Sequence, residues 1–258
     1  MTTSTSRTSS SKALFAYQSS RVGVTTVDVA FTDRHGGISG GPYASLDLGD
    51  RAAREGELDA NLARLAEAFT GDASSPLALM RQVHGRDVAV VDGVADPAPR
   101  ADALVTDAPG LTLVVRAADC LPVLIADAEH GLVAAAHAGR PGLVAGVVPA
   151  VVAQLRVRGA RSMVAWLGPH VCGSCYEVPE AMRAEVAEVS PESFATTSWG
   201  TPAVDIAAGV TAQLLADGVE VVDLDDAARC TIEDDDLFSY RRQGAASGRL
   251  AGVIRVRP

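Results

Sequence analysis

The stretch LTLVVRAADCLPVLIADAEHGLVAAAHAG, residues 111–139, holds three short apolar runs that turn residues separate. Leu111–Val115, Pro122–Ala126 and Leu132–Ala136 each have the length and the apolar content of a buried strand. Comparable runs on both sides predict further strands at Val22–Phe31, Leu77–Val83, Val88–Val91, Ala103–Thr106, Met163–Leu167, Val219–Val222 and Leu250–Val256. The centre of the chain should therefore be rich in sheet.

Helices are expected around this sheet-rich centre. Leu58–Phe69 repeats apolar side chains at helical spacing, which predicts an amphipathic helix. Leu143–Val157 has the length of a helix, and Pro141 before it suits a first helical turn. Glu180–Glu188 and Ile206–Ala216 are predicted as further helices. Strands and helices do not alternate regularly, and G-x-G-x-x-G and P-loop sequences are absent. We therefore expect a mixed α+β fold rather than a doubly wound dinucleotide-binding sheet.

The domain organisation follows from composition. Residues 1–12 are polar and of low complexity, which predicts a disordered tail rather than a secretory signal peptide. Residues 13–258 show neither a repeat nor a linker-like change in composition, so we expect one domain. At 258 residues and 48% hydrophobic content, the chain can bury a sizeable core. Its apolar runs are too short for a membrane span.

The chain is acidic, with 22 Lys and Arg against 32 Asp and Glu and a formal net charge of −10. This balance disfavours sequence-independent binding to nucleic acid or to an anionic membrane, so a small-molecule substrate is expected. The four cysteines, at positions 120, 172, 175 and 230, form no regular disulfide framework. Reduced thiols and a cytoplasmic location are therefore expected. The sequence does not indicate an oligomeric state.

Three residues together predict an open metal site, namely His84, Cys120 and His137. Each follows an apolar, strand-like run and stands at a turn of small residues. Two imidazoles and one thiolate suit Zn²⁺, and three protein ligands leave the fourth tetrahedral position for water or substrate. A single cysteine in an apolar strand is more often inert packing, so the prediction depends on the three residues together. Asp119 could orient a ligand histidine or accept a proton, or it could serve a turn.

Cys172-Gly-Ser-Cys175 has the C-x-x-C spacing of a redox motif or of half a zinc site. Its context argues against both, because Pro169 precedes it, Tyr176-Glu-Val-Pro179 continues in extended fashion, and no second C-x-x-C completes a tetrahedral shell. We expect a loop close to the main site without a metal of its own. One of its thiols could still serve as an alternative ligand.

The stretch Phe238–Arg249 concentrates Arg241, Arg242, Arg249 and two glycines in an acidic chain. Arginine presents a planar fork that matches phosphate oxygens, and glycines let backbone N–H groups approach a ligand, so the stretch could cradle an anion. Alternatively, Arg241 and Arg242 could pair with the acidic run Glu233–Asp236 on the surface. The residues alone leave both interpretations open.

Motifs along nearly the whole chain occur in an order typical of one family. They are RHGGIS (34–39), YASLDLG (43–49), QVHG (82–85), ADALVT (101–106), ADCLP (118–122), AHAG (136–139), GP (168–169), YEV (176–178), FSYRR (238–242) and GR (248–249). In this order they resemble the YfiH-type proteins, long labelled multicopper polyphenol oxidoreductases or laccases and now regarded as zinc-dependent purine nucleoside phosphorylases. Several matches in the correct order are more specific than any single motif.

The resemblance implies a single-domain α/β/β/α layered sandwich, similar to a cysteine-hydrolase fold. It implies that His84, Cys120 and His137 bind a catalytic Zn²⁺, and we place Cys120, His137 and Asp119 in catalysis. The implied reaction is phosphorolysis of adenosine, inosine, guanosine and 5′-methylthioadenosine, with adenosine deamination as a second activity. The partners would then be a purine nucleoside and phosphate.

The expected contacts of nucleoside and phosphate are Arg34, Arg241, Arg242 and Arg249. Two positions depart from the family pattern. Arg140-Pro141 stands where Trp-Arg is common, which removes an aromatic wall and displaces an arginine by one position. Asp47 stands where Asn is common and replaces an amide with a carboxylate.

Three other functions compete with this one. A copper oxidase would need more than the five histidines of this chain to hold a trinuclear cluster beside a blue-copper site. A cytoplasmic amide hydrolase that edits peptidoglycan precursors would use Cys120 as its nucleophile and a histidine as its base. Metal content separates it from the phosphorylase, because a zinc-bound thiolate is not free to attack. A non-catalytic nucleoside-binding domain would keep the arginines and tolerate the loss of zinc.

Overall fold

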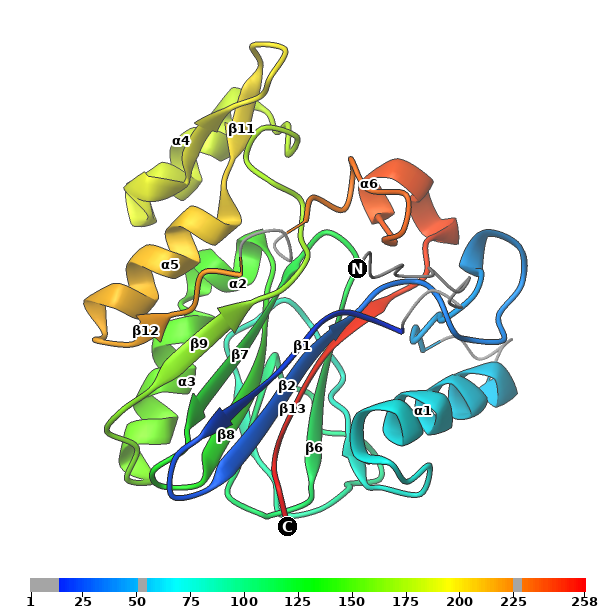
Figure 1. Cartoon of the computed structure of the whole chain (residues 1–258). Coiled ribbons are helices and arrows are strands. Elements are labelled where there is room, and N and C mark those ends of the chain that lie inside the picture. The colour runs from blue at the N-terminus through cyan, green and yellow to red at the C-terminus, as the bar shows by residue number, and fades with distance from the viewer. Residues whose placement is uncertain (1–13, 51–54, 225–228) are drawn as a thin grey trace, which may run out of the picture.

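Two stacked β-sheets form the centre of the computed structural model, which describes residues 14–50, 55–224 and 229–258 (Figure 1). The five-stranded sheet has the order β1 (Phe15–Val22), β2 (Thr26–Thr32), β13 (Leu250–Val256), β6 (Thr112–Ala117) and β3 (Leu77–Ala78). The six-stranded sheet has the order β12 (Glu220–Val221), β9 (Val164–Leu167), β7 (Leu121–Asp127), β8 (Leu132–Ala138), β5 (Ala103–Thr106) and β4 (Val88–Val90). A separate hairpin pairs β10 (Phe194–Thr196) with β11 (Pro202–Val204). The predicted tail, residues 1–12, lies outside the described residues.

The longer helices lie on the outer sides of the two sheets (Figure 1). The five-stranded sheet is covered by α1 (Glu55–Thr70), whereas the six-stranded sheet carries α2 (Arg140–Ala145), α3 (Val147–Val157) and α5 (Ile206–Ala216). Helix α4 (Glu180–Val189) packs beside the β10–β11 hairpin. A single turn, α6 (Tyr240–Gln243), precedes β13. Short 3-10 turns occupy Gly41–Tyr43, Pro191–Ser193 and Gly244–Ala246. None of the helices that the structure describes is long and apolar enough to cross a bilayer.

The alternation of side chains along the strands produces these layers. In β7, Val123 packs in the core that contains α3 and α5, whereas Leu124 packs in the core between the two sheets. In β13, Ile254 faces the other sheet, and Val253 faces the side that α1 covers. The resulting order of layers, helices on sheet on sheet on helix, confirms the predicted α/β/β/α sandwich.

Several predicted elements match the structure closely. The ranges predicted for β5, α5 and β13 agree with the observed bounds, and those for α1, α4, β4, β6, β7, β8, β9 and β12 differ from them by a few residues at most. These segments are strongly apolar or clearly amphipathic, so their periodicity alone identifies them.

The predicted single strand Val22–Phe31 was wrong. Val22 ends β1, the chain reverses where Gly23 donates its N–H to the Thr25 carbonyl at 2.9 Å, and Thr26 begins β2. β1 was not predicted because most residues toward its C-terminal end are exposed and polar, so no apolar run marks this strand. β2, in contrast, is buried along nearly its whole length.

The predicted helix Leu143–Val157 is two helices. Gly146 has φ 81° and ψ 44°, so it ends α2 in the left-handed region and α3 begins at the next residue. Pro141 does lie in the first turn of α2, as predicted. The predicted strand Leu77–Val83 is correct only for Leu77–Ala78, and the β10–β11 hairpin and α6 were not predicted.

Candidate metal centre and binding cleft

The three predicted metal ligands converge at one end of the six-stranded sheet. The antiparallel register of β7 and β8 places Pro122 opposite His137, so Cys120 lies beside the imidazole. His84 comes from the loop after β3, and its Nε2 is 3.7 Å from the Cys120 sulfur. The two imidazole rings have centroids 4.7 Å apart. One ligand atom from each of the three residues lies within 4.8 Å of the others.

Asp102, fully buried before β5, positions both histidines. Its carboxylate accepts a hydrogen bond from His137 Nδ1 at 2.9 Å, so Nε2 is the ring nitrogen left for a metal. The same carboxylate accepts the backbone N–H groups of His84 at 2.9 Å and Gly85 at 2.6 Å. His84 has φ 60°, a left-handed conformation that is uncommon outside glycine, and these bonds hold it there.

Asp102 was not predicted as a site residue, although it lies in the ADALVT motif. For Asp119 the sequence left open an orienting role, a role as proton acceptor and a turn role, and its carboxylate contacts neither histidine in the hydrogen bonds of the described residues. Asp119 accepts the Thr231 hydroxyl at 2.6 Å on one oxygen and the Arg241 backbone N–H at 2.6 Å on the other. It lines the cleft and has φ 85°, so its role is to tie the loop before β7 to the segment that carries Arg241.

The charges of the site favour a thiolate beside an imidazolium. Burial disfavours the ionised thiol of Cys120, but the hydrogen bonds and charges of His137 and His84 outweigh it and lower the pKa of Cys120 to about 6. Burial also disfavours the imidazolium of His137, yet Asp102 and Cys120 raise the pKa of that ring to about 9. A metal ion that binds here must therefore displace the His137 proton.

The donor set and the backbone around it fit a metal ion. Two ring nitrogens and one sulfur are suitable ligands, and three protein ligands leave a position open toward the cleft. Gly139 passes so close that a Cβ atom there would lie 2.9 Å from His84 Cδ2 and 3.0 Å from Cys120 Sγ. The backbone therefore fills the space behind the ligands, and glycine is needed for that approach.

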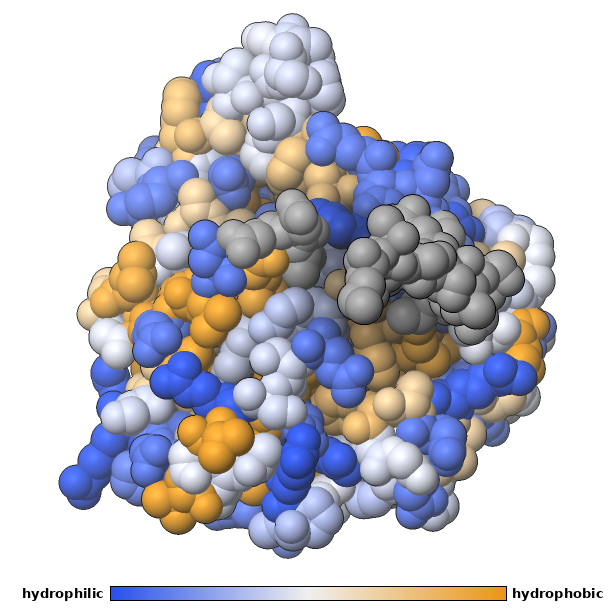
Figure 2. Space-filling model, viewed as in Figure 1, coloured by the Kyte–Doolittle hydropathy of each residue, from blue (hydrophilic) through white to orange (hydrophobic). Residues whose placement is uncertain are grey.

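The three ligands open onto a cleft of about 620 Å³, which is in the range of small-molecule sites. Among the residues that the structure describes, four arginines, two tyrosines and two carboxylates line it, namely Arg81, Arg116, Arg241, Arg249, Tyr176, Tyr240, Asp50 and Asp119. Hydrophilic side chains gather over α6, which supplies Tyr240 and Arg241 to one wall (Figure 2). The cleft thus combines an open ligand trio with positive charge and aromatic surface.

Only two of the four predicted substrate arginines line this cleft. Arg241 donates to the Glu177 carbonyl at 2.9 Å and lies over the Tyr176 ring, and Arg249 donates to its own loop. Arg34 donates to the Ala44 carbonyl at 2.7 Å and lies over Phe238, outside the cleft lining.

Arg242 also lies outside the cleft lining, where it stabilises the preceding turn. Its guanidinium donates to the carbonyls of Ile232 at 3.1 Å and Asp234 at 3.0 Å, and it pairs with Asp235 at 3.1 Å. The interpretation in which the acidic run pairs with arginine is therefore correct for Arg242, whereas Arg241 faces the cleft.

Arg81 and Arg116 are cleft residues that the sequence did not identify. Arg116, on β6, donates to the carbonyls of Leu48 at 3.2 Å and Met80 at 3.3 Å, and burial lowers its pKa. Arg81 lies on an exposed edge, and no hydrogen bond or ion pair joins its side chain to the residues that the structure describes. Both arginines are single charged residues next to apolar runs that predict strands, so neither belongs to a motif that would indicate substrate binding.

Arg140, one of the two residues that depart from the family pattern, lies beside Tyr176. Tyr176 lines the cleft, and Arg140 hydrogen-bonds to it and, with Arg241, opposes the rise that burial causes in its pKa. The Asp47 departure is structural, since its carboxylate accepts the backbone N–H groups of Gly49 at 2.8 Å and Arg249 at 2.9 Å.

The other three histidines have partners away from the trio. His35 Nε2 lies 2.8 Å from Asp236, His130 Nδ1 lies 2.9 Å from Asp127, and His170 Nδ1 lies 2.9 Å from the Gly168 carbonyl. None of them lines the cleft of the metal ligands. The remaining cysteines form a separate group with Glu233.

Residues 28–257 match the family model described as multi-copper polyphenol oxidoreductase laccase. A purine nucleoside phosphorylase of Streptomyces coelicolor is 53% identical over 229 residues, which cover 87% of this chain and 93% of that protein. A purine nucleoside phosphorylase of Corynebacterium glutamicum is 44% identical over 230 residues, 87% of this chain and 92% of that one.

Solved structures show the same similarity. YlmD from Geobacillus stearothermophilus superposes with a TM-score of 0.78 at 30% identity, covering 90% of this chain and 92% of that one. YfiH from Bacillus licheniformis superposes with a TM-score of 0.77 at 25% identity, covering 90% and 93%.

Proposed function

Because this chain belongs to the multi-copper polyphenol oxidoreductase laccase family, the YfiH type, we propose that it is a zinc-dependent purine nucleoside phosphorylase. Its substrates would be adenosine, inosine, guanosine and 5′-methylthioadenosine, with phosphate as the second substrate. Adenosine deamination would be a side activity. The relatives named purine nucleoside phosphorylase support the phosphorylase activity. The substrate range follows from the family resemblance, and the donor set of the site supports zinc.

One observation carries the proposal. The ligand trio of His84, Cys120 and His137 opens directly onto a 620 Å³ cleft that four arginines and two tyrosines line. Phosphorolysis needs a site for an anion next to a site for a purine, and the arginines and the tyrosines offer these two surfaces in one cavity. An oxidase of phenols would have no use for this concentration of positive charge.

The arginines can hold phosphate and stabilise charge in the transition state. Phosphate must reach the anomeric carbon of the ribose while the base leaves, so catalysis depends on positioning and on electrostatic stabilisation. No hydrogen bond or ion pair joins the Arg81 side chain to the residues that the structure describes, and Arg241 and Arg249 line the same cleft. Arg116 is committed to two carbonyls and adds its charge from the cleft floor.

The metal site contributes positioned ligands. Asp102 fixes the His137 tautomer, and the N–H bonds to His84 and Gly85 fix the second histidine, so both rings are set before a metal binds. When bound, zinc would act as a Lewis acid and would lower the pKa of water in its open position, which suits deamination of adenosine. The aromatic rings of Tyr176 and Tyr240 offer the purine a stacking surface.

The test is turnover of adenosine by the purified full chain with and without phosphate, with adenine resolved from inosine by chromatography. Phosphate-dependent adenine is expected, together with a smaller amount of inosine that does not depend on phosphate. Cys120→Ala and His84→Ala should lose turnover together with the zinc that the trio of His84, Cys120 and His137 would hold. His130→Ala is the matched control, because His130 is bound to Asp127 away from the cleft.

If zinc binds at the trio but the protein turns over no nucleoside, the substrate assignment is discarded. Zinc loss in Cys120→Ala with turnover retained would discard the metal dependence. A variant that unfolds, as judged by circular dichroism, is replaced by the more conservative His84→Gln.

A second candidate is favoured by one specific observation. Three neighbouring residues match the catalytic residues of a cysteine hydrolase. Cys120, whose pKa is lowered, would be the nucleophile, His137 the base, and the buried Asp102 the carboxylate that orients the base. The metal-free protein could then hydrolyse amides, including those of peptidoglycan precursors. Amide turnover that zinc inhibits and iodoacetamide abolishes would favour this candidate over the phosphorylase.

We also propose a cytoplasmic location. All four cysteines are free thiols, which fits a reducing compartment. Fractionation of the native cells with an antibody to the chain would test it, and recovery with the secreted proteins would contradict it.

A further inference from the structure

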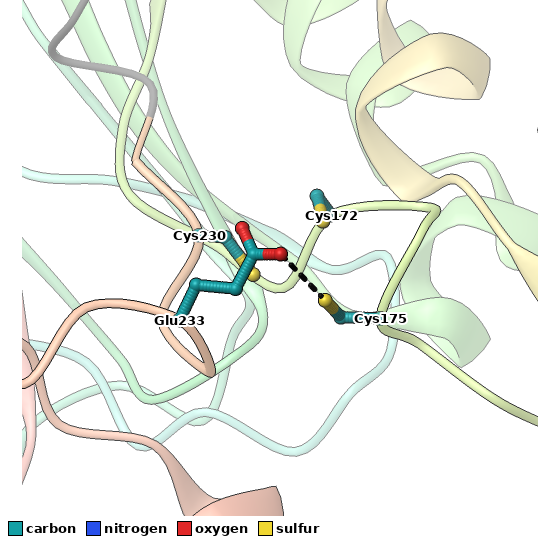
Figure 3. Close-up of side chains that lie close together, drawn as sticks. All are labelled: Cys172, Cys175, Cys230 and Glu233. Carbon is teal, nitrogen blue, oxygen red and sulfur yellow. Dashed lines mark hydrogen bonds between the residues drawn. The ribbon is translucent and has the colours of Figure 1, made fainter. Parts of the chain in front are cut away.

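Outside the cleft, three cysteines and one carboxylate from two distant segments meet in one group, which we call the three-cysteine cluster: Cys172, Cys175, Cys230 and Glu233 (Figure 3). One ligand atom from each member lies within 4.8 Å of all the others. The Cys175 sulfur is 3.3 Å from a Glu233 carboxylate oxygen. None of these residues lines the cleft of the ligand trio, so the cluster is a distinct site.

The backbone brings the two segments together independently of the side chains. His170 pairs with Cys230 in a parallel bridge, and the Thr231 N–H donates to the His170 carbonyl at 2.9 Å. On one side, a tight turn presents two of the sulfurs, since the N–H groups of Cys175 and Tyr176 both donate to the Cys172 carbonyl. The cysteines of the C-x-x-C motif therefore point toward the second segment.

The second segment is a turn that presents the other two donors. The Asp234 N–H donates to the Cys230 carbonyl at 3.0 Å, which places Cys230 and Glu233 on one turn. Arg242 holds the carbonyls on both sides of Glu233, those of Ile232 and Asp234. Gly173 is packed against Asp205, where a Cβ would come within 2.7 Å of the Asp205 Cβ. The ligand geometry is thus set by hydrogen bonds and packing before any ion binds.

The spacing of the donor atoms is that of a tetrahedral metal shell. Two sulfurs that each lie 2.3 Å from a tetrahedral zinc are about 3.8 Å apart, so donor atoms within 4.8 Å need only a small contraction to share an ion. Thiolates select zinc or copper(I), and an added carboxylate oxygen favours zinc. Glu233 is exposed, which gives an ion a path into the cluster.

Three thiolates and a carboxylate as close together as these would repel one another. A divalent cation that replaces the thiol protons would remove that repulsion. A disulfide would use two of the three thiols, would leave the third and the carboxylate without a role, and would need an oxidant.

We propose that the three-cysteine cluster is a second metal site that binds Zn²⁺ through four protein ligands. Four protein ligands leave no position for substrate, so the site is structural rather than catalytic. The sequence interpretation of a C-x-x-C loop without its own metal is replaced, because the missing half of the shell comes from a segment far along the chain.

The second site stabilises the wall of the cleft. One of its segments continues into Tyr176, and the other continues into Tyr240 and Arg241, all of which line the cleft. Arg241 already connects the two segments by donating to the Glu177 carbonyl. Loss of the metal should therefore loosen substrate binding more than it slows the chemical step. This consequence depends on the proposed function, whereas the metal site does not.

The first experiment measures zinc per chain in the full-length protein, reconstituted anaerobically and freed of loosely bound metal. Wild type should hold two zinc ions. Cys120→Ala and Cys230→Ser should each hold one, and the double variant should hold none. Ser174→Ala is the matched control, since Ser174 is an exposed residue within the same C-x-x-C turn, and it should hold two.

The second experiment identifies the ligands by replacing zinc with cobalt(II) in the Cys120→Ala background, where only the second site remains. Three thiolates should give a strong thiolate-to-cobalt charge-transfer band in the near ultraviolet, together with the visible bands of tetrahedral cobalt. Glu233→Gln should keep the charge-transfer band, shift the visible bands and weaken metal binding by about tenfold or more. This variant retains all three thiols, so it tests the site even if Cys230→Ser fails to fold.

Two outcomes would overturn the proposal. One is Cys120→Ala protein that takes up neither zinc nor cobalt. A deficit of two thiols per chain, when the unfolded and unreduced protein is titrated, would identify a disulfide instead. Two zinc ions per chain without nucleoside turnover would retain this site and discard only the proposed function.

Discussion

Asp102 and His137 form a buried pair in which the carboxylate lies 2.9 Å from the imidazole Nδ1, and the same carboxylate also binds the backbone of the loop that carries His84. One side chain thus sets two of the three predicted ligands. Replacement of this residue should therefore affect metal binding more than any other change outside the ligands themselves.

Asp102→Asn should lower zinc affinity at the cleft site about 10–100-fold, because the amide cannot hold His137 in the same tautomer and serve the backbone donors as well. Competition with a chromophoric chelator measures the change. Asp127→Asn is the matched control, since Asp127 is equally buried and accepts backbone and histidine donors at the far end of β7. Equal losses of zinc affinity in both variants would show that the effect is general destabilisation.

Gly139→Ala should weaken metal binding while the fold persists. Gly139 has φ −82°, which alanine can adopt, so the only new feature is a Cβ within 3.0 Å of the ligands His84 and Cys120. Zinc content should fall and the melting temperature of the metal-free protein should change little. Gly40→Ala, where a Cβ meets nothing within 4 Å, should leave both quantities unchanged. Unaltered zinc affinity in Gly139→Ala would mean that the ligands can move away from this backbone.

Arg81→Gln should raise the KM for phosphate about tenfold, because the cleft loses a charged donor whose side chain pairs with none of the described residues. The KM for the nucleoside should change less. Arg21→Gln is the control, as Arg21 forms only a 3.7 Å surface pair with Glu220. An unchanged KM for phosphate in Arg81→Gln would place the anion on Arg241 and Arg249 instead.

Asp28 should make stability depend on pH in the acid range. Burial acts to raise the pKa of Asp28, but the hydrogen bonds from Arg257, Ser20 and Arg255 outweigh it and leave the pKa below its ordinary value. A carboxyl whose pKa is lowered by folding stabilises the protein above the unfolded pKa, about 3.9, and this contribution disappears as the pH falls through the folded value.

Asp28→Asn should therefore lower the unfolding free energy by about 2 kcal/mol near pH 7, because the pairs with arginine are lost. The loss stays this small because Arg257 is half-exposed and solvent screens its charge. The difference from wild type should narrow as the pH falls below about 4. Urea unfolding at several pH values measures it, and a difference that stays constant to pH 3 would refute the assignment.

Local patterns predicted the individual strands and helices and the ligand trio, whereas the α/β/β/α layers were expected from the family resemblance. Apolar runs identify β5 and β13, and each predicted ligand follows such a run, which is why His84, Cys120 and His137 were expected to meet. The break at Gly146 was missed because one glycine inside an apolar stretch is compatible with either a continuous helix or a left-handed end.

The supporting residues could not be predicted because their partners are distant in sequence. The role of Asp102 depends on backbone N–H groups in another loop, and no motif encodes that contact. For the same reason Arg34 and Arg242 were assigned to the cleft, whereas tertiary contacts direct them to carbonyl groups. The three-cysteine cluster was missed because Cys230 joins the C-x-x-C motif only through folding.

The position of Asp119 has a consequence for how the two proposed metal sites would fill. This residue immediately precedes the thiol of the cleft site and binds the hydroxyl of Thr231, which immediately follows a thiol of the three-cysteine cluster. A metal ion bound at one site would, through this hydrogen bond, also order the segment that carries the thiol of the other site. The second ion would then lose less conformational entropy when it binds. Thermodynamic reciprocity makes that assistance equal in both directions, so the two ions should load cooperatively, with few singly occupied chains at half saturation.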